Sequence, residues 1–288
     1  MSSPRDPGGP EAADGDDDAA LAADLDPVRI ENELARSAAS WGRPLVVAPL
    51  TASTNDDAKR AARAGAPEGA AFVADAQSGG RGRLGRTWFS PSGENLYASF
   101  VLRPAFDPKR IPLVTLTAGL AVVDVVAPLV PNRHVGLKWP NDVFIDGRKV
   151  AGILSEAQVL EGIAAWVVIG IGINVRTTAF PPEIEAGATS LALAGASSLD
   201  RGALFVDLAG ALFRRIEMLR EGKVRDLVAA FAARDELAGQ SITVDGAPAT
   251  ALGIADDGAL VIRRTSGGDE KCVAGDVQLS LARRVVDP

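Results

Sequence analysis

The chain has 288 residues, 47% of them hydrophobic, which is enough for a sizeable core in one or two domains. The net charge of −7 comes from the first 27 residues, which hold eight acids and one base, while the other 29 bases and 29 acids balance. A neutral body argues against general nucleic-acid binding, which needs a basic surplus.

Residues 1–26 are rich in Gly, Pro, Ala and Asp and hold too few apolar side chains to order themselves. We therefore predict a disordered acidic tail, and because it has no apolar signal region we expect a cytoplasmic protein. Asp26-Pro27 then combines an N-cap with a proline at the first helical position, which predicts a helix to about Trp41. Leu45–Leu50 is predicted to be a short strand.

A second helix is predicted to begin at Ser53 or Thr54 and to run to Ala64, where Gly65 ends it. Because its first turn follows a strand, the turn is also suited to bind an anion. From this stretch alone, a simple helix cap and an anion site both remain open.

The loop between the predicted strands Glu68–Gln77 and Leu96–Leu102 alternates arginines with glycines and ends in Trp88 and Phe89. Glycine admits positive φ and lets main-chain N–H groups approach an anion, arginine adds a planar fork of donors, and the aromatic pair supplies a flat wall. These features predict a site for an anionic ligand with a ring-shaped part. A G-R-G-R segment also fits a flexible RNA-binding loop, but the flanking strands favour a site.

The most apolar run, Ile111–Val130, is interrupted by Pro112, Asp124 and Pro128. It is therefore predicted to be a core helix, because a membrane span needs ~18 uncharged apolar residues. No membrane attachment is expected. Downstream, Asp146-Gly147 predicts a tight turn between two strands.

Two features lie on either side of that turn. Lys138 follows one apolar residue and precedes another in K-W-P-N-D, so it either snorkels to solvent or is a deliberately placed cation. Ala164–Val175 is predicted to be a buried strand on which Gly170 and Gly172 share one face. Bare backbone there indicates that a ligand or another chain packs closely, or simply that the packing is tight.

In the C-terminal third, two amphipathic helices are predicted over about Asp200–Glu221 and Val224–Leu237, and after them the helical periodicity ends. From Gln240 the chain reads as short strands separated by turns, which predicts a small β-barrel. We therefore divide the chain into the tail 1–26, a main domain 27–238 and a small β domain 239–288.

The inventory of reactive side chains is short. His134 is the single histidine and Cys272 the single cysteine, and there is no G-x-S-x-G elbow, zinc-ligand spacing, P-loop or kinase motif. The candidate groups that remain are four cations with nearby hydroxyl and amide side chains: Arg81, Arg83, Arg86 and Lys138, with Ser53, Thr54, Asn55, Gln77, Asn141 and Asn174. Such a set suits the joining of two anions, such as a carboxylate and a nucleotide phosphate, in which positioning and electrostatics do most of the catalysis.

Four motifs in order carry a resemblance: S-T-N, G-R-G-R-L-G-R-T-W-F-S-P, K-W-P-N-D-V with R-K-V-A-G-I-L-S-E, and G-I-G-I-N-V. Over roughly residues 45–280 the chain resembles the biotin protein ligases, also called biotin–acetyl-CoA-carboxylase ligases. The resemblance implies an α+β fold with a mixed β-sheet catalytic domain, flanking helices and a C-terminal SH3-like β-barrel. It also implies that biotin and MgATP give biotinyl-5′-AMP, which acylates a lysine of the biotin carboxyl carrier domain of an acyl-CoA carboxylase.

The resemblance further implies roles for individual residues. Lys138 and Arg83 are expected to be catalytic, because Lys138 would neutralise the carboxylate and the α-phosphate while the loop that contains Arg83 orders over them. Contacts with biotin are implied for Ser53, Thr54, Asn55, Gln77, Gly80, Arg81, Gly82, Arg83, Lys138 and Gly152. Contacts with ATP or the adenylate are implied for Arg86, Trp88, Asn141, Gly170, Gly172 and Asn174. Metal ligands stay open, with Asp142 either a ligand or a turn residue.

Three other functions remain open: a lipoate–protein ligase, a non-catalytic biotin sensor and an RNA-binding protein. The pair G-R-G-R and K-W-P-N-D favours biotin, and the intact set of Lys138 and three arginines favours catalysis. Only about 45 residues precede the first predicted core strand, which is too few for a winged-helix domain, so no DNA repression is expected. A monomer and a weak homodimer are both compatible with the resemblance.

Overall fold

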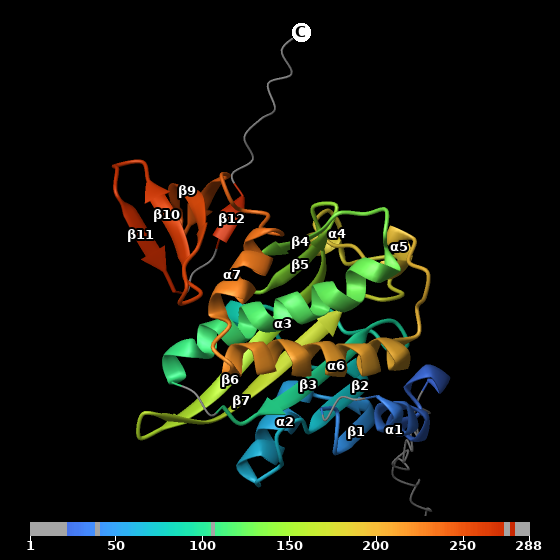
Figure 1. Ribbon diagram of the computed structural model, residues 1–288. Coiled ribbons are helices and arrows are strands. Elements are labelled where there is room, and N and C mark those ends of the chain that lie inside the picture. Colours follow the sequence, from blue (N-terminus) through green and yellow to red (C-terminus); the bar gives the residue numbers. More distant parts are fainter. Residues whose placement is uncertain (1–21, 38–40, 105–106, 274–276, 280–288) are drawn as a thin grey trace, which may run out of the picture.

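A seven-stranded mixed sheet forms the centre of the protein, and a five-stranded antiparallel sheet lies beside it (Figure 1). This computed structural model describes residues 22–37, 41–104, 107–273 and 277–279. The large sheet has the order β1-β2-β3-β7-β6-β5-β4, in which β1 and β2 are parallel and the other neighbours are antiparallel. Its strands are β1 Leu45–Thr51, β2 Ala71–Gln77, β3 Leu96–Leu102, β4 Val135–Lys138, β5 Asp142–Ile145, β6 Arg148–Leu160 and β7 Ile163–Ile173.

One face of the large sheet packs against a layer of helices and holds the main core (Figure 1). Side chains alternate along a strand, so Leu96, Phe100 and their even-numbered neighbours in β3 point to this face. Phe100 stacks on Phe205 with ring centroids 5.6 Å apart. The helices of this layer are α1 Pro27–Arg36, α3 Ile111–Val126, α6 Arg201–Arg220 and α7 Val224–Ala232.

The opposite face carries a smaller core beneath a single helix, α2 Thr54–Arg63. Ala58 and Ala62 of α2 pack there against Val101, Trp166 and Val168 of β3 and β7. Because α2 is short, it leaves the rest of this face for side chains from loops. The functional cavity lies there, at the N-terminal end of α2.

The helical segment Pro108–Leu129 is long and apolar enough to cross a membrane by length and composition alone. It consists of the 3-10 helix η3 Pro108–Arg110, α3 and the 3-10 helix η4 Ala127–Leu129. However, 61% of its most apolar window is buried inside the fold, where α3 packs against α6 and the sheet. The prediction of a core helix is confirmed.

The C-terminal sheet has the order β11-β10-β9-β8-β12 and agrees with the small SH3-like domain that was expected. Among the described residues its two edge strands, β11 and β12, do not pair, so the closed barrel of the prediction is seen as an open sheet. Its strands are β8 Ser241–Val244, β9 Ala247–Ile254, β10 Leu260–Arg264, β11 Asp269–Cys272 and β12 Val277–Leu279.

Two predicted boundaries need correction. The first helix ends at Arg36 instead of about Trp41, and the helix predicted to reach Leu237, α7, ends at Ala232. After β7 the chain forms a short helix, α4 Pro182–Glu185, and then another, α5 Leu191–Ala194.

The predicted disorder of the N-terminal tail is wrong for residues 22–26, while residues 1–21 lie outside the described part of the chain. Ala23–Leu25 form the 3-10 helix η1, and Leu25 is completely buried in the main core. The composition of the tail did not reveal this order because it depends on a buried ion pair between Asp24 and the distant Arg201.

Candidate active site

A cavity of about 510 Å³ opens on the face of the large sheet that α2 only partly covers. All residues predicted for the site line this cavity except Gly80, although they come from five separate segments of the chain. Gly80 is buried beneath the loop, where a Cβ atom would lie 2.5 Å from Ser90 Oγ and 2.8 Å from the Trp88 carbonyl oxygen. A glycine is therefore needed there for packing, and its main chain accepts a hydrogen bond from Trp88 N.

The first turn of α2 forms one polar wall of the cavity. Ser53, Thr54 and Asn55 are buried and lie where β1 ends and the helix begins. Gln77, at the end of the neighbouring strand β2, accepts a hydrogen bond from Thr54 N at 2.9 Å. Ser53 occupies the N-cap position but its side chain makes no capping hydrogen bond, so the interpretation of Ser53 as a simple cap is wrong.

A buried network behind this wall fixes the orientation of Asn55. Its Oδ1 accepts a hydrogen bond from Ser99 Oγ at 2.6 Å, and its Nδ2 donates to Glu156 Oε2 at 2.9 Å and to the Leu154 carbonyl at 3.2 Å. Ser99 Oγ also lies 2.8 Å from Thr54 Oγ1. Each polar group thus has a set partner, which gives the wall a defined pattern of donors and acceptors.

Three glycines form the floor of the cavity. Gly170 and Gly172 of β7 share one face, as predicted, and Gly152 of β6 pairs with Gly172. A Cβ atom on Gly172 would lie 2.5 Å from Trp88 Nε1, and one on Gly170 would collide with the Asn55 side chain. The bare backbone therefore lets the Trp88 indole and the Asn55 amide approach the sheet closely.

The Arg/Gly loop, residues 77–95, folds over the edge of the cavity. Arg81 reaches α2, where its Nη2 lies 2.5 Å from Asp56 Oδ1 and 3.6 Å from Glu156 Oε2. Burial alone would raise the pKa of Asp56, but hydrogen bonds from Lys59 and Arg81 lower it. Arg83 extends the other way and donates to Asn141 Oδ1 at 3.4 Å. The loop therefore contacts both α2 and the K-W-P-N-D turn. Arg86, also in the loop, is exposed at the rim.

Two lysines bring positive charge to the cavity. Lys138 Nζ lies 5.8 Å from the centroid of the Phe144 ring. Lys149, which the sequence analysis did not select, has its Nζ 5.2 Å from the centroid of the Trp88 ring and 2.7 Å from Asp142 Oδ1.

A β-bulge explains why Lys149 was missed. In a regular strand Lys149 and Gly152 would point to opposite faces, because they are three residues apart. The register between β5 and β6 shifts after Val143, so β6 has one extra residue and both side-chain positions face the cavity. The only signal in the sequence was the motif R-K-V-A-G itself.

The far end of the cavity is built by the chain after β7. Asn174 is buried and its Nδ2 donates to the Thr189 carbonyl at 2.9 Å, which ties it to the loop that follows. Phe180 and Ile184 from this loop line the cavity, and so does Val277 of β12. The contribution of Val277 had no signal in the sequence, because it comes from the other sheet.

The donor set of the cavity suits phosphates and a hard cation more than a bound transition metal. Among the residues that the structure describes, no three His, Cys, Asp or Glu side chains gather to hold a metal ion. Asp142 and Asn141 offer oxygen atoms of the kind that Mg²⁺ takes together with phosphates. His134 does not line the cavity, and its Nε2 lies 2.8 Å from Glu236 Oε1.

Comparisons with known proteins agree on one family. The model of the biotin/lipoate A/B protein ligase family matches residues 47–174. The biotin–(acetyl-CoA-carboxylase) ligase of Mycobacterium tuberculosis is 37% identical over 225 residues, which cover 77% of this chain and 81% of that protein. The bifunctional ligase/repressor BirA of Bacillus subtilis is 34% identical over 252 residues, which cover 83% of this chain and 74% of BirA.

Solved structures show the same fold. A biotin protein ligase from Aquifex aeolicus in complex with biotin and ATP superposes with a TM-score of 0.69 and 27% identity, covering 83% of this chain and 99% of that one. A biotin protein ligase from Leishmania major in complex with biotinyl-5-AMP gives a TM-score of 0.55 and 26% identity, covering 79% and 98%.

Proposed function

This chain belongs to the biotin protein ligase family, and from that premise we propose that it attaches biotin to protein in two steps. Biotin and MgATP first give biotinyl-5′-AMP and pyrophosphate. A lysine amine of a biotin carboxyl carrier domain then attacks the acyl carbon, which forms an amide and releases AMP. The observation that carries the proposal is that one cavity joins a polar wall, a glycine floor and a set of cations.

The polar wall suits the uncharged ring system of biotin. Ser53, Thr54, Asn55 and Gln77 supply hydroxyl and amide groups whose partners are set by the network around Ser99. The ring would lie against the glycine floor near Gly152 and Gly172, so the Trp88 indole that covers these glycines would shift to admit it. Arg81 and Gly82 would close over the ligand from the loop.

The cations suit the two anions that must meet. In the first step a biotin carboxylate oxygen attacks the α-phosphorus of ATP, the bond from that phosphorus to the β-phosphate oxygen breaks, and pyrophosphate leaves. Lys138 and Arg83 would neutralise the carboxylate and the α-phosphate, and Lys149 adds a third charge above the glycine floor. Mg²⁺ would arrive with ATP, and the side-chain oxygens of Asp142 and Asn141 would help to hold it.

The nucleotide would occupy the far end of the cavity. Arg86, Trp88, Asn141, Gly170, Gly172 and Asn174 are the residues we assign to ATP and the adenylate. The Arg/Gly loop would then shield the acyl-adenylate from water until a carrier domain arrives. We propose carrier domains of acyl-CoA carboxylases as acceptors, the cytoplasm as the location, and a monomer or weak homodimer as the active form.

The decisive experiment measures pyrophosphate release from ATP and Mg²⁺ with either biotin or lipoate and no acceptor protein. We expect release with biotin only, followed by transfer of labelled biotin to an added carrier domain. Release with lipoate only would keep the fold and change the substrate. Tight biotin binding by calorimetry without any pyrophosphate release would contradict the ligase and favour a sensor.

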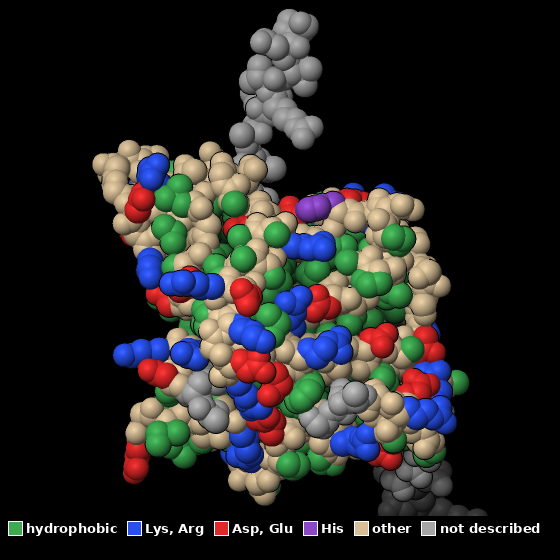
Figure 2. Space-filling model, in the orientation of Figure 1, with side chains coloured by type: hydrophobic (Ala, Val, Ile, Leu, Met, Phe, Trp, Pro, Cys, Tyr) green, Lys and Arg blue, Asp and Glu red, His purple; other side chains and the backbone are tan. Residues whose placement is uncertain are grey.

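We also propose that the protein does not repress transcription, although one relative is a bifunctional ligase/repressor. The charge outside the first 27 residues is balanced, and Figure 2 shows Lys and Arg side chains interspersed with Asp and Glu over the face in view. DNA binding without a basic surplus is weak. A gel-shift assay with biotinyl-adenylate and a biotin-operon promoter tests this, and a specific shift at physiological salt would contradict it.

A further inference from the structure

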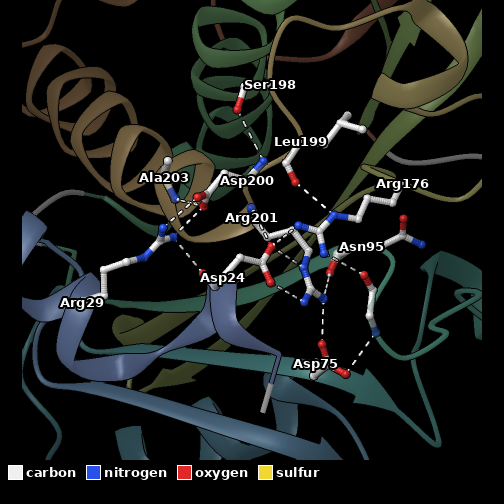
Figure 3. Close-up of polar contacts among 11 residues, drawn as sticks. Asp24, Arg29, Asp75, Asn95, Arg176, Ser198, Leu199, Asp200, Arg201 and Ala203 are labelled. Atoms are coloured by element: carbon white, nitrogen blue, oxygen red, sulfur yellow. Dashed lines mark hydrogen bonds and ion pairs between the residues drawn. The ribbon is translucent and has the colours of Figure 1, made fainter.

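A cluster of charges with a buried centre and a half-buried edge lies outside the cavity, where the start of α6 meets the large sheet (Figure 3). It contains equal numbers of aspartates and arginines, so its net charge is zero. Arg201 is at its centre and is completely buried. We call this group the Arg201 cluster; its members are Asp24, Arg29, Asp75, Arg176, Asp200 and Arg201.

Two carboxylates bind the guanidinium of Arg201. Asp24 accepts two hydrogen bonds, from Nη2 at 2.8 Å and from Nε at 3.1 Å, and Asp75 Oδ1 lies 2.8 Å from Nη1. Arg176 Nη2 lies 2.5 Å from Asp24 as well. Asp24 comes from η1 and Asp75 from β2, so Arg201 joins the N-terminal segment to the sheet.

The ion pair between Arg29 and Asp200 forms the edge of the cluster. Arg29 of α1 forms a fork of hydrogen bonds of 2.6 and 2.7 Å to Asp200, and it also donates to the Asp24 carbonyl. Asp200 in turn accepts from Ala203 N and caps α6. The position of Asp24 is therefore set both by its charge and by its main chain.

Stability alone is a poor explanation for this arrangement. Moving a charge out of water is expensive, and well-packed apolar residues often serve a buried position equally well. A buried ion network does fix geometry, because each of its hydrogen bonds has one direction and one partner. The question is therefore which parts of the protein the Arg201 cluster holds in place.

The cluster holds the bases of two segments that line the cavity. One is the Arg/Gly loop, and the other is the segment that follows β7. Asp75 Oδ2 accepts hydrogen bonds from Ser92 Oγ and, at 3.0 Å, from Gly93 N, where the Arg/Gly loop returns to β3. Arg176, two residues after Asn174, donates from its Nη1 to the Gly93 carbonyl at 3.2 Å and from its N–H to the Glu94 carbonyl at 2.8 Å. Both loops are thus tied to the same buried charges.

We propose that Asp24, Asp75 and Arg201 are positioning residues for adenylate formation and retention, an inference that rests on the function proposed above. None of them lines the cavity. By fixing the two loop bases relative to each other, they reduce the entropy lost when the loops order over biotin and ATP. The segment 22–26 is then part of the support of the active site.

The test compares Asp24→Asn, Asp75→Asn and Asp24→Glu with wild type in the full-length protein, well below each melting temperature. We expect the two asparagine variants to raise KM for both biotin and ATP about tenfold with a smaller change in kcat. We also expect the asparagine variants to release more biotinyl-adenylate into solution than wild type for each carrier domain that they label. Asp24→Glu keeps the charge, so it should restore most of the wild-type KM for biotin and ATP and most of the adenylate retention. If Asp75→Asn does not fold, Asp24→Asn decides, because it leaves Arg201 paired with Asp75.

Asp124→Asn is the matched control. Asp124 forms hydrogen bonds of 2.7 and 2.8 Å to Arg215, which joins α3 to the same helix α6 without touching either loop. Asp124→Asn should lower the melting temperature and leave the KM for biotin, the KM for ATP and adenylate retention unchanged. Wild-type kinetics in Asp24→Asn and Asp75→Asn, or equal effects in Asp124→Asn, would overturn the inference. Failure of the proposed function would show differently, as absence of biotin-dependent pyrophosphate release in the wild type.

Discussion

Lys138 of β4 and Lys149 of β6 bring positive charge to the cavity from strands on either side of β5, and their surroundings differ. Lys149 is paired with Asp142 and lies above the Trp88 ring, whereas Lys138 lies over Phe144. The ion pair with Asp142 restrains the position of the Lys149 ammonium group. Both ammonium groups are therefore placed to meet an anion, and they can be tested separately.

We expect Lys138→Ala and Lys149→Ala each to lower the rate of adenylation by about 10²–10³-fold, because each removes a charge that acts mainly in the transition state. Single-turnover formation of biotinyl-adenylate at saturating biotin and ATP measures the rate, and calorimetry measures biotin affinity. Lys271→Ala is the control, because Lys271 is exposed and pairs with Asp257, and neither residue lines the cavity. If a lysine variant forms the adenylate at the wild-type rate at saturating biotin and ATP but binds biotin much more weakly, that lysine acts in binding only.

Among the secondary-structure elements, strand β7 contributes to the site through what it lacks. Gly170 has no side chain where the Asn55 amide lies, and Asn55 is held there by Ser99 and Glu156. The strand therefore supports the cavity only while its backbone stays bare on this face.

Gly170→Ala should lower the free energy of unfolding by about 1–3 kcal/mol, since the new methyl group must displace a tightly held amide. Biotin affinity should fall with it, because Asn55 belongs to the wall. Urea denaturation and calorimetry measure the two effects. In the double variant Gly170→Ala/Asn55→Ala much of the lost stability should return; strictly additive losses would show that the two positions do not collide.

The short helix η1 is held to α6 by charge, which makes its attachment sensitive to acid. Burial would raise the pKa of Asp24, but hydrogen bonds and charges from Arg201 and Arg176 outweigh burial and lower it to about 2. An unfolded aspartate has a pKa of about 3.9. Because the folded pKa is the lower one, Asp24 contributes its full stability above about pH 4 and loses it as the pH falls to 2.

We expect Asp24→Asn to be less stable than wild type by about 2 kcal/mol at pH 6, and the difference to shrink between pH 4 and pH 2. Urea denaturation at several pH values in this range measures the free energy of unfolding of both proteins. A difference that is the same at pH 6 and pH 2.5 would contradict the account, because the stability would then not depend on the carboxylate charge.

At the scale of the whole molecule, the two sheets share one hydrophobic core. Ile242 and Leu260 of the small sheet belong to the same buried cluster as Leu113 of α3. The buried Trp139 donates from its Nε1 to the Gly258 carbonyl at 2.9 Å, which ties the K-W-P-N-D turn to the small sheet. The domain boundary between residues 238 and 239 stays a prediction from the sequence pattern. We do not expect it to separate two independently stable units.

Thermal unfolding should therefore be a single cooperative transition in which the calorimetric and van't Hoff enthalpies agree. Trp139→Phe should lower the free energy of unfolding by about 1 kcal/mol, because it removes one buried hydrogen bond and leaves the Gly258 carbonyl unpaired. Differential scanning calorimetry measures both effects. Two resolved transitions in the wild type would show that the small sheet unfolds by itself.

Local features were predictable from the sequence alone. Strand β3, the core helix α3 and the turn at Asp146-Gly147 follow from apolar runs, prolines and turn residues, and the shared face of Gly170 and Gly172 follows from strand periodicity. These signals act through the conformational preferences of neighbouring residues, which do not require the rest of the chain. Nearly all the residues that the motifs assigned to the site line the cavity.

Only the tertiary structure decided which distant groups meet. It ordered Asp24 by pairing it with Arg201, turned Lys149 into the cavity through a bulge, and brought Val277 from the second sheet. It also gave Ser53 a place in the cavity wall in place of a capping role. Each of these outcomes depends on packing between segments far apart in the chain, where local propensity carries no information about the partner.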